Sequence, residues 1–219
     1  LNVIKKKPRQ LHVIESLVTF INLYDLIYIR EIKAIKHKIK FLGKFSKNIT
    51  KNNTVNNLLN LLDEKGLLKG KKFEIKIIKN IPQKSGMGGG SMNASSIIKY
   101  LLKKKILNSS KKNINNITKS IGSDVQLGMN LKNTIMSQTG KLTTNEKKIG
   151  LYTLIVKPNF GCSTKVIYST TKAQTKPMYN TPRISFFSIE NIINSNNDLE
   201  KAAFKLNPKL KILKLFLLS

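Results

Sequence analysis

The pattern of apolar and polar positions predicts strands and helices that follow one another along the first part of the chain. Residues 13–32 are dense in β-branched and aromatic side chains, with a turn expected near Asn22, which favours strands on either side. In residues 51–70 the apolar spacing becomes that of a helix, which Asn and Thr residues begin and Gly66 ends. One face of this helix carries Val55, Leu58, Leu59 and Leu62.

Strict alternation follows in residues 72–82 and predicts a strand that Pro82 ends. Helical spacing then predicts a helix over 93–107 and a shorter one over 113–128, interrupted at Gly122. Three alternate side chains form the apolar face of the strand: Phe73, Ile75 and Ile77.

The last third predicts one more strand and then mainly helix. Residues 151–158 (LYTLIVKP) are apolar and end at a proline, which favours a strand, and the chain after Thr164 is expected to be mostly helical. The lysine spacing in 209–219 predicts an amphipathic helix. Strands and helices mixed in this way predict an α+β fold, with a lobe boundary near the polar residues 143–150.

One segment between a predicted strand and a predicted helix is unusual, KNIPQKSGMGGGSMNASS at 79–96, because it holds four of the chain's 12 glycines. A helix N-terminus exposes unpaired N–H groups and the positive end of the helix dipole, and glycines let an anion approach the backbone closely. Ser91 and Ser95 are expected to add hydroxyl donors there. The order strand, loop, helix therefore favours a phosphate site over the alternative, a flexible loop tip.

The known phosphate-loop patterns narrow this prediction. No Gly-Lys-Ser/Thr follows the glycines, so the loop is not a Walker motif, and their spacing does not match the dinucleotide pattern G-x-G-x-x-G. The protein-kinase motifs H-R-D and D-F-G are absent from the sequence.

The loop resembles the second motif of the GHMP kinases and, within that superfamily, the loop of the 4-diphosphocytidyl-2-C-methyl-D-erythritol kinase family. That loop runs Ile-Pro, three residues, then Gly-Leu-Gly-Gly-Gly-Ser-Ser-Asn/Asp-Ala. Met87 replaces the leucine, and Met92 replaces the second serine, which removes one hydroxyl. The matching residues are Ile81, Pro82, Gly86, Gly88, Gly89, Gly90, Ser91, Asn93 and Ala94.

This resemblance implies an ATP-binding segment. The backbone amides and hydroxyls of the loop are expected to surround the triphosphate. The residues concerned are Pro82, Gln83, Lys84, Ser85, Gly86, Met87, Gly88, Gly89, Gly90, Ser91 and Met92.

The segment IGSDVQLG, 121–128, resembles the Gly-Ala/Ser-Asp-Val/Ile-Pro segment of the family, with Gln126 in place of proline. The resemblance implies that Asp124 is the catalytic aspartate. Taken alone, an Asp after Gly-Ser is more often a turn residue or a helix cap, so the catalytic interpretation depends on its occurrence together with the glycine-rich loop.

The cytidine-gripping segment of the family, Arg-Arg-Pro-Asp-Gly-Tyr-His-x-Leu-x-Ser, is matched less well by residues 6–16. Pro8, His12 and Ser16 fit, but Leu11 stands at the stacking tyrosine and Arg9-Gln10 replace Asp-Gly. The resemblance implies that His12 contacts the substrate. Considered alone, such a histidine is more often packed or on the surface.

Two later segments also resemble the family: VKPNFGCSTKVIY, 156–168, and NTPR, 180–183. They imply a substrate contact at Thr181 and at Tyr168, which is able to stack on a base. The alternative for Tyr168, beside apolar Val166 and Ile167, is a place in the core.

Taken together, the resemblance implies ATP-dependent phosphorylation, with Mg²⁺, of the 2-hydroxyl of a cytidine diphosphate-linked methylerythritol in the non-mevalonate isoprenoid pathway. It implies a two-lobed fold: an ATP-binding lobe over 1–149 and the start of an incomplete C-terminal lobe over 150–219. The family's Lys-x-Asn strand is expected before Leu1 and its third, glycine-rich motif after Ser219. We therefore expect weak or no kinase activity from this chain alone.

Charge changes this picture little. Lys and Arg number 40 against 11 Asp and Glu, a formal net charge of +29, yet only three residues are arginine and the lysines form no aromatic-flanked tract. We interpret the excess as compositional bias, which favours anionic small molecules and argues against a nucleic-acid partner. The sequence leaves the oligomeric state undetermined.

The remaining composition excludes several classes of site. A single cysteine, Cys162, permits no internal disulfide and fits a reducing compartment, so we expect the cytoplasm. With two distant histidines, His12 and His37, it makes a protein metal site improbable. No apolar run approaches the length of a membrane span, so we expect no membrane partner.

Three alternatives stay open from the sequence. The first is a basic nucleic-acid-binding protein whose glycine loop is incidental. The second is another GHMP small-molecule kinase. The third is a degenerate relative that binds without turnover, given Leu11, Met92 and Gln126.

Overall fold

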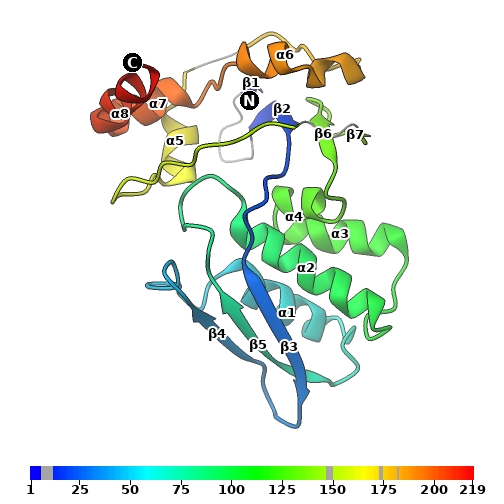
Figure 1. Cartoon of the computed structure of the whole chain (residues 1–219). Helices are drawn as coiled ribbons and strands as arrows, with labels where there is room; N and C mark the ends of the chain where they lie inside the picture. Colours follow the sequence, from blue (N-terminus) through cyan, green and yellow to red (C-terminus); the bar gives the residue numbers. More distant parts are fainter. Residues whose placement is uncertain (6–11, 147–149, 173–174, 182) are drawn as a thin grey trace. The chain divides into compact units, whose positions relative to one another are not determined.

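The computed structural model of the chain describes residues 1–5, 12–146, 150–172, 175–181 and 183–219. Its strands form two sheets, and helices connect and cover them, which confirms the predicted α+β class (Figure 1). By the contacts between Cα atoms the chain divides into two compact units. One unit is residues 22–131, and the other combines residues 1–21 with residues 132–219.

The 22–131 unit is built on a three-stranded sheet. The central strand, β5 (Lys72–Ile78), pairs antiparallel with β3 (Leu26–Ile32) and parallel with β4 (Lys38–Leu42). Parallel strands need a long crossover between them, and here α1 (Thr54–Glu64) lies in that connection. The predicted strand at 72–82 is therefore confirmed, but it ends at Ile78, four residues before Pro82.

The first helix begins and ends as its sequence predicts. The Asn53 side chain accepts hydrogen bonds from the N–H groups of Val55 and Asn56, which satisfies two of the free donors at the N-terminus. Gly66 follows the last turn with φ of 65°, a left-handed conformation that glycine adopts without strain.

A hydrophobic core lies between this sheet and its helices. Helix α2 (Gly89–Lys103) and helix α3 (Lys111–Ile121) pack with α1 over the apolar face of β5, and the short helix α4 (Ser123–Gly128) contacts α2 and α3. Full burial of one Leu or Ile side chain contributes about 1.5–3 kcal/mol. The buried core residues include Leu58, Leu59, Leu62, Phe73, Ile75, Ile77, Ile97, Ile98 and Leu101.

The other unit contains a four-stranded antiparallel sheet. Its order is β1 (Asn2–Lys5), β2 (Val13–Val18), β6 (Asn133–Met136) and β7 (Leu142–Asn145). Strand β2, together with β3 of the other unit, confirms the prediction of strands on either side of Asn22, whereas β1, β4, β6 and β7 were not predicted. Its small core centres on Ile135, Tyr179 and Phe187.

Short helices follow in this unit, as expected after Thr164, although the described residues between 171 and 183 are not helical. The last helix forms at the expected place. None of its side chains is buried, so it does not pack an apolar face on a core as an amphipathic helix would. The elements are α5 (Thr164–Thr170), the 3₁₀ helix η1 (Ile184–Phe187), α6 (Ile189–Ile193), α7 (Glu200–Leu206) and α8 (Pro208–Leu218).

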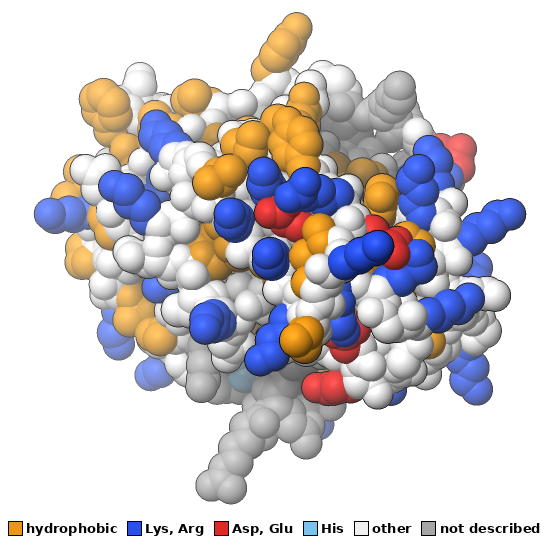
Figure 2. All heavy atoms as spheres, turned by 90° about the horizontal axis from the view of Figure 1, so that it is seen from below, with side chains coloured by type: hydrophobic (Ala, Val, Ile, Leu, Met, Phe, Trp, Pro, Cys, Tyr) orange, Lys and Arg blue, Asp and Glu red, His pale blue; other side chains and the backbone are white. Residues whose placement is uncertain are grey.

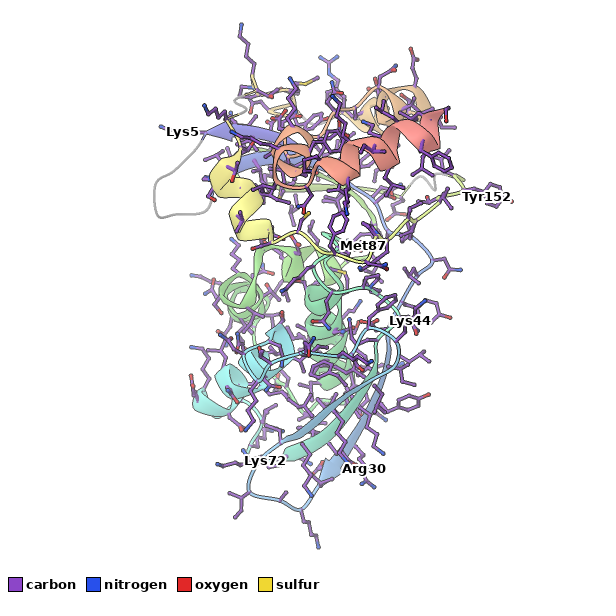
Figure 3. All side chains as sticks on the ribbon, turned by 90° about the vertical axis from the view of Figure 1, so that its left-hand side faces the viewer. Lys5, Arg30, Lys44, Lys72, Met87 and Tyr152 are labelled. Carbon is purple, nitrogen blue, oxygen red and sulfur yellow. The ribbon has the colours of Figure 1, made fainter. Side chains whose placement is uncertain are left out.

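The predicted strand over 151–158 is wrong. These residues adopt no regular secondary structure, and Tyr152, Leu154 and their neighbours are exposed. Tyr152 points away from the ribbon in Figure 3. An apolar run becomes a strand only where a neighbouring strand takes up its backbone hydrogen bonds, and no described segment pairs with this one.

Positively charged side chains are dispersed over the face of the molecule that Figure 2 shows. On the face in Figure 2, Lys and Arg side chains alternate with apolar and neutral ones, and acidic side chains are few. This agrees with the absence of an aromatic-flanked lysine tract from the sequence. Within the described residues, no helix has both the length and the apolar character needed to cross a membrane.

Candidate active site

The glycine-rich segment forms the loop between β5 and α2 and the first turns of α2 in the 22–131 unit (Figure 1). Gly86 and Gly88 have φ of 74° and 66°, in the left-handed region that side chains disfavour. Gly88 is the N-cap of α2, and no side chain caps this helix N-terminus. The N–H groups of its first turn therefore point out of the helix without an intrahelical partner.

Close packing explains the next two glycines. A Cβ added to Gly89 would lie 2.8 Å from Cγ2 of Ile81, a distance that real side chains do not reach. A Cβ added to Gly90 would lie 3.1 Å from Oγ1 of Thr54. The start of α2 thus packs closely against the segment that follows β5 and against α1, because Gly89 and Gly90 have no side chain.

Two polar side chains of the loop donate to backbone carbonyl oxygens of the protein. Gln83 Nε2 donates to the carbonyl oxygens of Phe45 at 2.8 Å and of Lys47 at 2.7 Å. Ser85 Oγ donates to the carbonyl oxygen of Pro82 at 2.8 Å. The side chains of Gln83 and Ser85 are therefore engaged within the protein, whereas the first-turn N–H groups of α2 are not.

Asp124 lies beside this loop, in the first turn of α4. Its Oδ2 is 3.5 Å from the point where a Cβ on Gly88 would stand, and the residue is exposed. Its Oδ1 accepts a hydrogen bond from Ser123 Oγ at 3.3 Å. The structure thus brings the predicted catalytic carboxylate to the N-terminus of α2, where negative charge is also stabilised by the helix dipole.

Helix α4 is held on α2 by a contact that the sequence interpretation missed. A Cβ on Gly128 would lie 2.3 Å from Ser95 Oγ and 2.9 Å from Cε of Met92, so any side chain at 128 would push the two helices apart. Ser95 is fully buried and donates to the carbonyl oxygens of Ser91 and Val125. The expectation that Ser95 offers its hydroxyl to a phosphate is therefore wrong, and Met92 fills the space beside Gly128.

Two predicted substrate residues come together in the other unit. His12 Nε2 donates to the carbonyl oxygen of Tyr168 at 3.2 Å, and the two ring centroids are 5.6 Å apart. Tyr168 is half-buried and belongs to neither of the hydrophobic clusters among the described residues, which disfavours a core role. Pro8 and Leu11, also named in the prediction, lie outside the described residues.

The third predicted substrate residue, Thr181, is exposed in an irregular segment. That segment is tied to β2, because the buried carboxylate of Glu15 accepts hydrogen bonds from the N–H groups of Met178 at 2.8 Å and Tyr179 at 3.2 Å. Burial, together with the Glu15 charge, raises the pKa of the Tyr179 hydroxyl. The backbone before Thr181 is therefore fixed by a residue three positions after His12.

Comparison with known proteins agrees with this geometry. Residues 53–138 match the family described as the GHMP kinases N terminal domain. The chain is 48% identical over 217 residues to the 4-diphosphocytidyl-2-C-methyl-D-erythritol kinase of Pelagibacter ubique, covering 99% of this chain and 77% of the relative. It belongs to the 4-diphosphocytidyl-2-C-methyl-D-erythritol kinase family.

Other relatives agree with this assignment. The enzyme of the same name from Anaplasma marginale is 30% identical over 219 residues, which is 96% of this chain and 74% of the relative. A crystal structure of 4-(cytidine 5'-diphospho)-2C-methyl-D-erythritol kinase superimposes with a TM-score of 0.65 at 18% identity, covering 97% of this chain and 76% of that one. The structural likeness shows the fold, and the chain spans about three quarters of each of these relatives.

Membership of this kinase family was predicted from the loop and from the Asp124 segment, but the residues that hold them were missed. Asp25, the residue before β3, accepts hydrogen bonds from the N–H groups of Asn80 and Ile81 ahead of the loop, and Gly128 packs against the side chains of Ser95 and Met92 in α2. A single acidic residue before a strand, or a glycine at the end of a short helix, has no local pattern that marks such a contact.

Proposed function

We propose that this chain is an ATP-dependent kinase that phosphorylates the 2-hydroxyl of 4-diphosphocytidyl-2-C-methyl-D-erythritol in the non-mevalonate isoprenoid pathway. The observation that carries the proposal is the position of the Asp124 carboxylate, with Oδ2 beside Gly88 at the uncapped N-terminus of α2. The names of the relatives support the choice of acceptor.

The phosphates of ATP are bound by backbone donors in this proposal. The first-turn N–H groups of α2 lack intrahelical partners, and they lie at the positive end of a helix of 15 residues. Anion binding at such an N-terminus needs no arginine or Walker lysine. The segment concerned is Pro82 to Met92, as the sequence predicts.

Asp124 acts on the acceptor. Phosphoryl transfer asks the protein chiefly to position its reactants and to stabilise charge. An exposed carboxylate beside the phosphate-binding N-terminus is able to accept the proton of the attacking hydroxyl at Oδ2, and such general-base help contributes about 10²- to 10⁴-fold. The Ser123 hydroxyl, which donates to Oδ1, leaves Oδ2 directed to the loop.

The residues present fit a magnesium ion held mainly by ATP. No group of three or more His, Cys, Asp or Glu side chains gathers in the described part of the chain, so a cage made only of protein ligands is not formed there. Mg²⁺ commonly binds through one or two carboxylates plus substrate phosphates; Asp124 would supply a carboxylate oxygen, and the phosphates held by the loop would supply the other ligands. When bound, the ion neutralises charge on the β- and γ-phosphate oxygens.

The residues that the resemblance assigns to the acceptor belong to the other unit. His12 and Tyr168 contact each other, so the two residues that the resemblance assigns to the acceptor lie at one place in this unit. Thr181 is exposed on a backbone that Glu15 fixes. The lobes over 1–149 and 150–219, and a location in the cytoplasm where ATP is supplied, belong to the same proposal.

Transfer of phosphate from ATP tests the proposal. The chain, with any residues encoded on either side of it, is incubated with ATP, Mg²⁺ and the cytidine-diphospho acceptor, and the monophosphorylated product is measured by mass. We expect product from wild type and a loss of turnover of about 10²- to 10⁴-fold in Asp124→Asn, with the affinity for a nonhydrolysable ATP analogue retained. Activity on homoserine or mevalonate but not on the cytidine-diphospho acceptor would overturn the choice of substrate.

A nucleic-acid-binding role makes the opposite predictions. Such a protein would bind RNA or DNA with a steep dependence on salt, and ATP analogues would not raise its melting temperature. The kinase proposal requires stabilisation by ATP analogues, because a ligand that binds only the folded state raises the free energy of unfolding.

A further inference from the structure

Asp25, the residue immediately before β3, has a carboxylate that is fully buried. Its side chain is 0% exposed, and that of its ion-pair partner Lys79 is 5% exposed. Oδ1 accepts hydrogen bonds from the N–H groups of Asn80 at 2.7 Å and Ile81 at 2.8 Å. Oδ2 accepts from Lys79 Nζ and from Asn93 Nδ2, the latter at 2.9 Å.

These four donors lie on both sides of the glycine-rich loop. Lys79, Asn80 and Ile81 precede the loop, and Asn93, which is itself buried, follows it in the first two turns of α2. All of the predicted ATP-binding segment, 82–92, lies between them. One carboxylate therefore joins the strand that leads into the loop to the helix that leads out of it.

The chemistry of this cluster makes it sensitive to small changes. An ionised carboxylate has about four acceptor positions, and four donors converge on this one. A buried charge is tolerated only when it is paired and hydrogen-bonded, so removal of one partner leaves the other charge without compensation. The distance between the two loop ends is thus fixed by the hydrogen bonds of the Asp25 carboxylate. Because this carboxylate is buried, water does not compete for those bonds.

A second carboxylate of the same unit provides the contrast. Asp63 in α1 accepts from Lys72 Nζ at 2.7 Å and lies 3.1 Å from His37 Nε2, and its side chain is 29% exposed. None of these partners belongs to the loop. Asp63 and Lys72 therefore form a carboxylate–lysine pair in the same unit that does not contact the loop.

We propose that Asp25 is a positioning residue for phosphate binding, which fixes the two ends of the 82–92 loop so that its N–H groups converge on one anion. This inference rests on the proposed function. Displacements of about 1 Å in a phosphate-binding site reduce activity by up to about a hundredfold. Loss of the Asp25 charge therefore weakens binding of the ATP phosphates, whereas binding of the cytidine moiety, which involves other residues, is retained.

The test compares ligand affinities by calorimetry, at the same interval below the melting temperature of each variant. The probes are a nonhydrolysable ATP analogue and cytidine diphosphate. Asp25→Asn keeps the size of the side chain but removes the charge and turns an amide donor toward Lys79. We expect its affinity for the ATP analogue to fall about tenfold or more, since a buried donor is left unsatisfied, with cytidine diphosphate affinity unchanged.

The matched control is Asp63→Asn, which removes a carboxylate–lysine pair of the same unit away from the loop. It is expected to lower the melting temperature but to leave affinity for the ATP analogue within about twofold, the spread expected for a site without contact. Equal weakening by Asp63→Asn, or a folded Asp25→Asn that binds the ATP analogue like wild type, would overturn the inference.

If Asp25→Asn does not fold, Asn93→Ala tests the positioning role of Asp25 instead. This variant removes only the link to α2 and buries no unpaired charge, and we expect about threefold to tenfold weaker binding of the ATP analogue. Wild-type affinity in Asn93→Ala would contradict the positioning role. Failure of the wild-type chain itself to bind the ATP analogue would instead overturn the proposed function, and this inference with it.

Discussion

The ion pairs at the two ends of the sheet β3–β5–β4 differ in burial and in their contacts with the backbone. At the end that leads into the loop, the Asp25–Lys79 pair is buried and bonded to backbone N–H groups. At the opposite end each pair has an exposed partner: Arg30, 72% exposed, bonds to the buried Glu74, and the exposed Lys71 bonds to the exposed Glu31. Figure 3 shows Lys44 and Met87 at the loop end and Arg30 and Lys72 at the other.

This difference indicates that the backbone is held more rigidly at the loop end than at the opposite end. Exposed ion pairs contribute about 0–1 kcal/mol because water and salt screen them. The hydrogen bond from Arg30 lowers the pKa of the Glu74 carboxyl, yet Arg30 ties no backbone in place. A buried carboxylate bonded to main-chain donors costs desolvation, but it fixes geometry, which a phosphate site needs.

Gly89→Val should break the loop end most severely. Its Cβ alone would stand 2.8 Å from Ile81 Cγ2, so the start of α2 must move and the phosphate-binding N–H groups move with it. We expect affinity for a nonhydrolysable ATP analogue to fall about a hundredfold or more by calorimetry. Gly150→Val is the control, since Gly150 has nothing within 4 Å of its added Cβ and no positive φ.

Gly128→Ala should have a smaller effect, and it acts on Asp124 rather than on the loop. The added Cβ would stand 2.3 Å from Ser95 Oγ, so α4 must shift on α2. We expect about 1–3 kcal/mol less stability by urea unfolding and a lower rate of transfer, with ATP-analogue affinity nearly intact. An unchanged transfer rate would mean that the placement of α4 does not set the position of Asp124.

Mild acid should affect the opposite end of the sheet, and least of all. His37 Nδ1 accepts the Phe73 N–H at 3.0 Å, and burial lowers the pKa of His37 although the Asp63 charge opposes it and Lys72 adds to it. Because the unfolded chain then binds the proton more readily, stability is complete above about pH 6.5 and falls as the pH drops below it.

Urea unfolding of the wild type between pH 7.5 and 5.5 measures this loss, and His37→Asn, which keeps an acceptor near Nδ1 but does not titrate, should reduce it. An equal loss in both proteins would assign the titration elsewhere. ATP-analogue affinity should change little over this range, which would separate the two ends of the sheet in one experiment.

Local patterns predicted the elements whose causes are local. The spacing of Val55, Leu58, Leu59 and Leu62 gives a helix in any context that buries one face, and all four are buried. The glycines at 86 and 88 are needed for positive φ, so a spacing of glycines carries information about the loop. The family was predicted because the loop is built from such local requirements.

Features that depend on distant partners were missed or wrong. The apolar run 151–158 forms no strand, because no described segment pairs with it. Ser95 was expected to face a phosphate, but the approach of α4 at Gly128 buries it. Asp25 gave no signal, since its role depends on Lys79 and Asn93, both more than 50 residues away in sequence.

The central claim is that backbone N–H groups at the start of α2 bind the phosphates of ATP beside Asp124. Amide chemical shifts of the ¹⁵N-labelled chain, recorded with and without a nonhydrolysable ATP analogue and Mg²⁺, test it most directly. We predict that the largest changes fall on the amides of Gly86 to Ser91 and on Asp124, since the Met92 N–H already donates to the Gly88 carbonyl oxygen at 2.9 Å. Saturable binding that leaves those amides unmoved, or no binding at all, would contradict the claim.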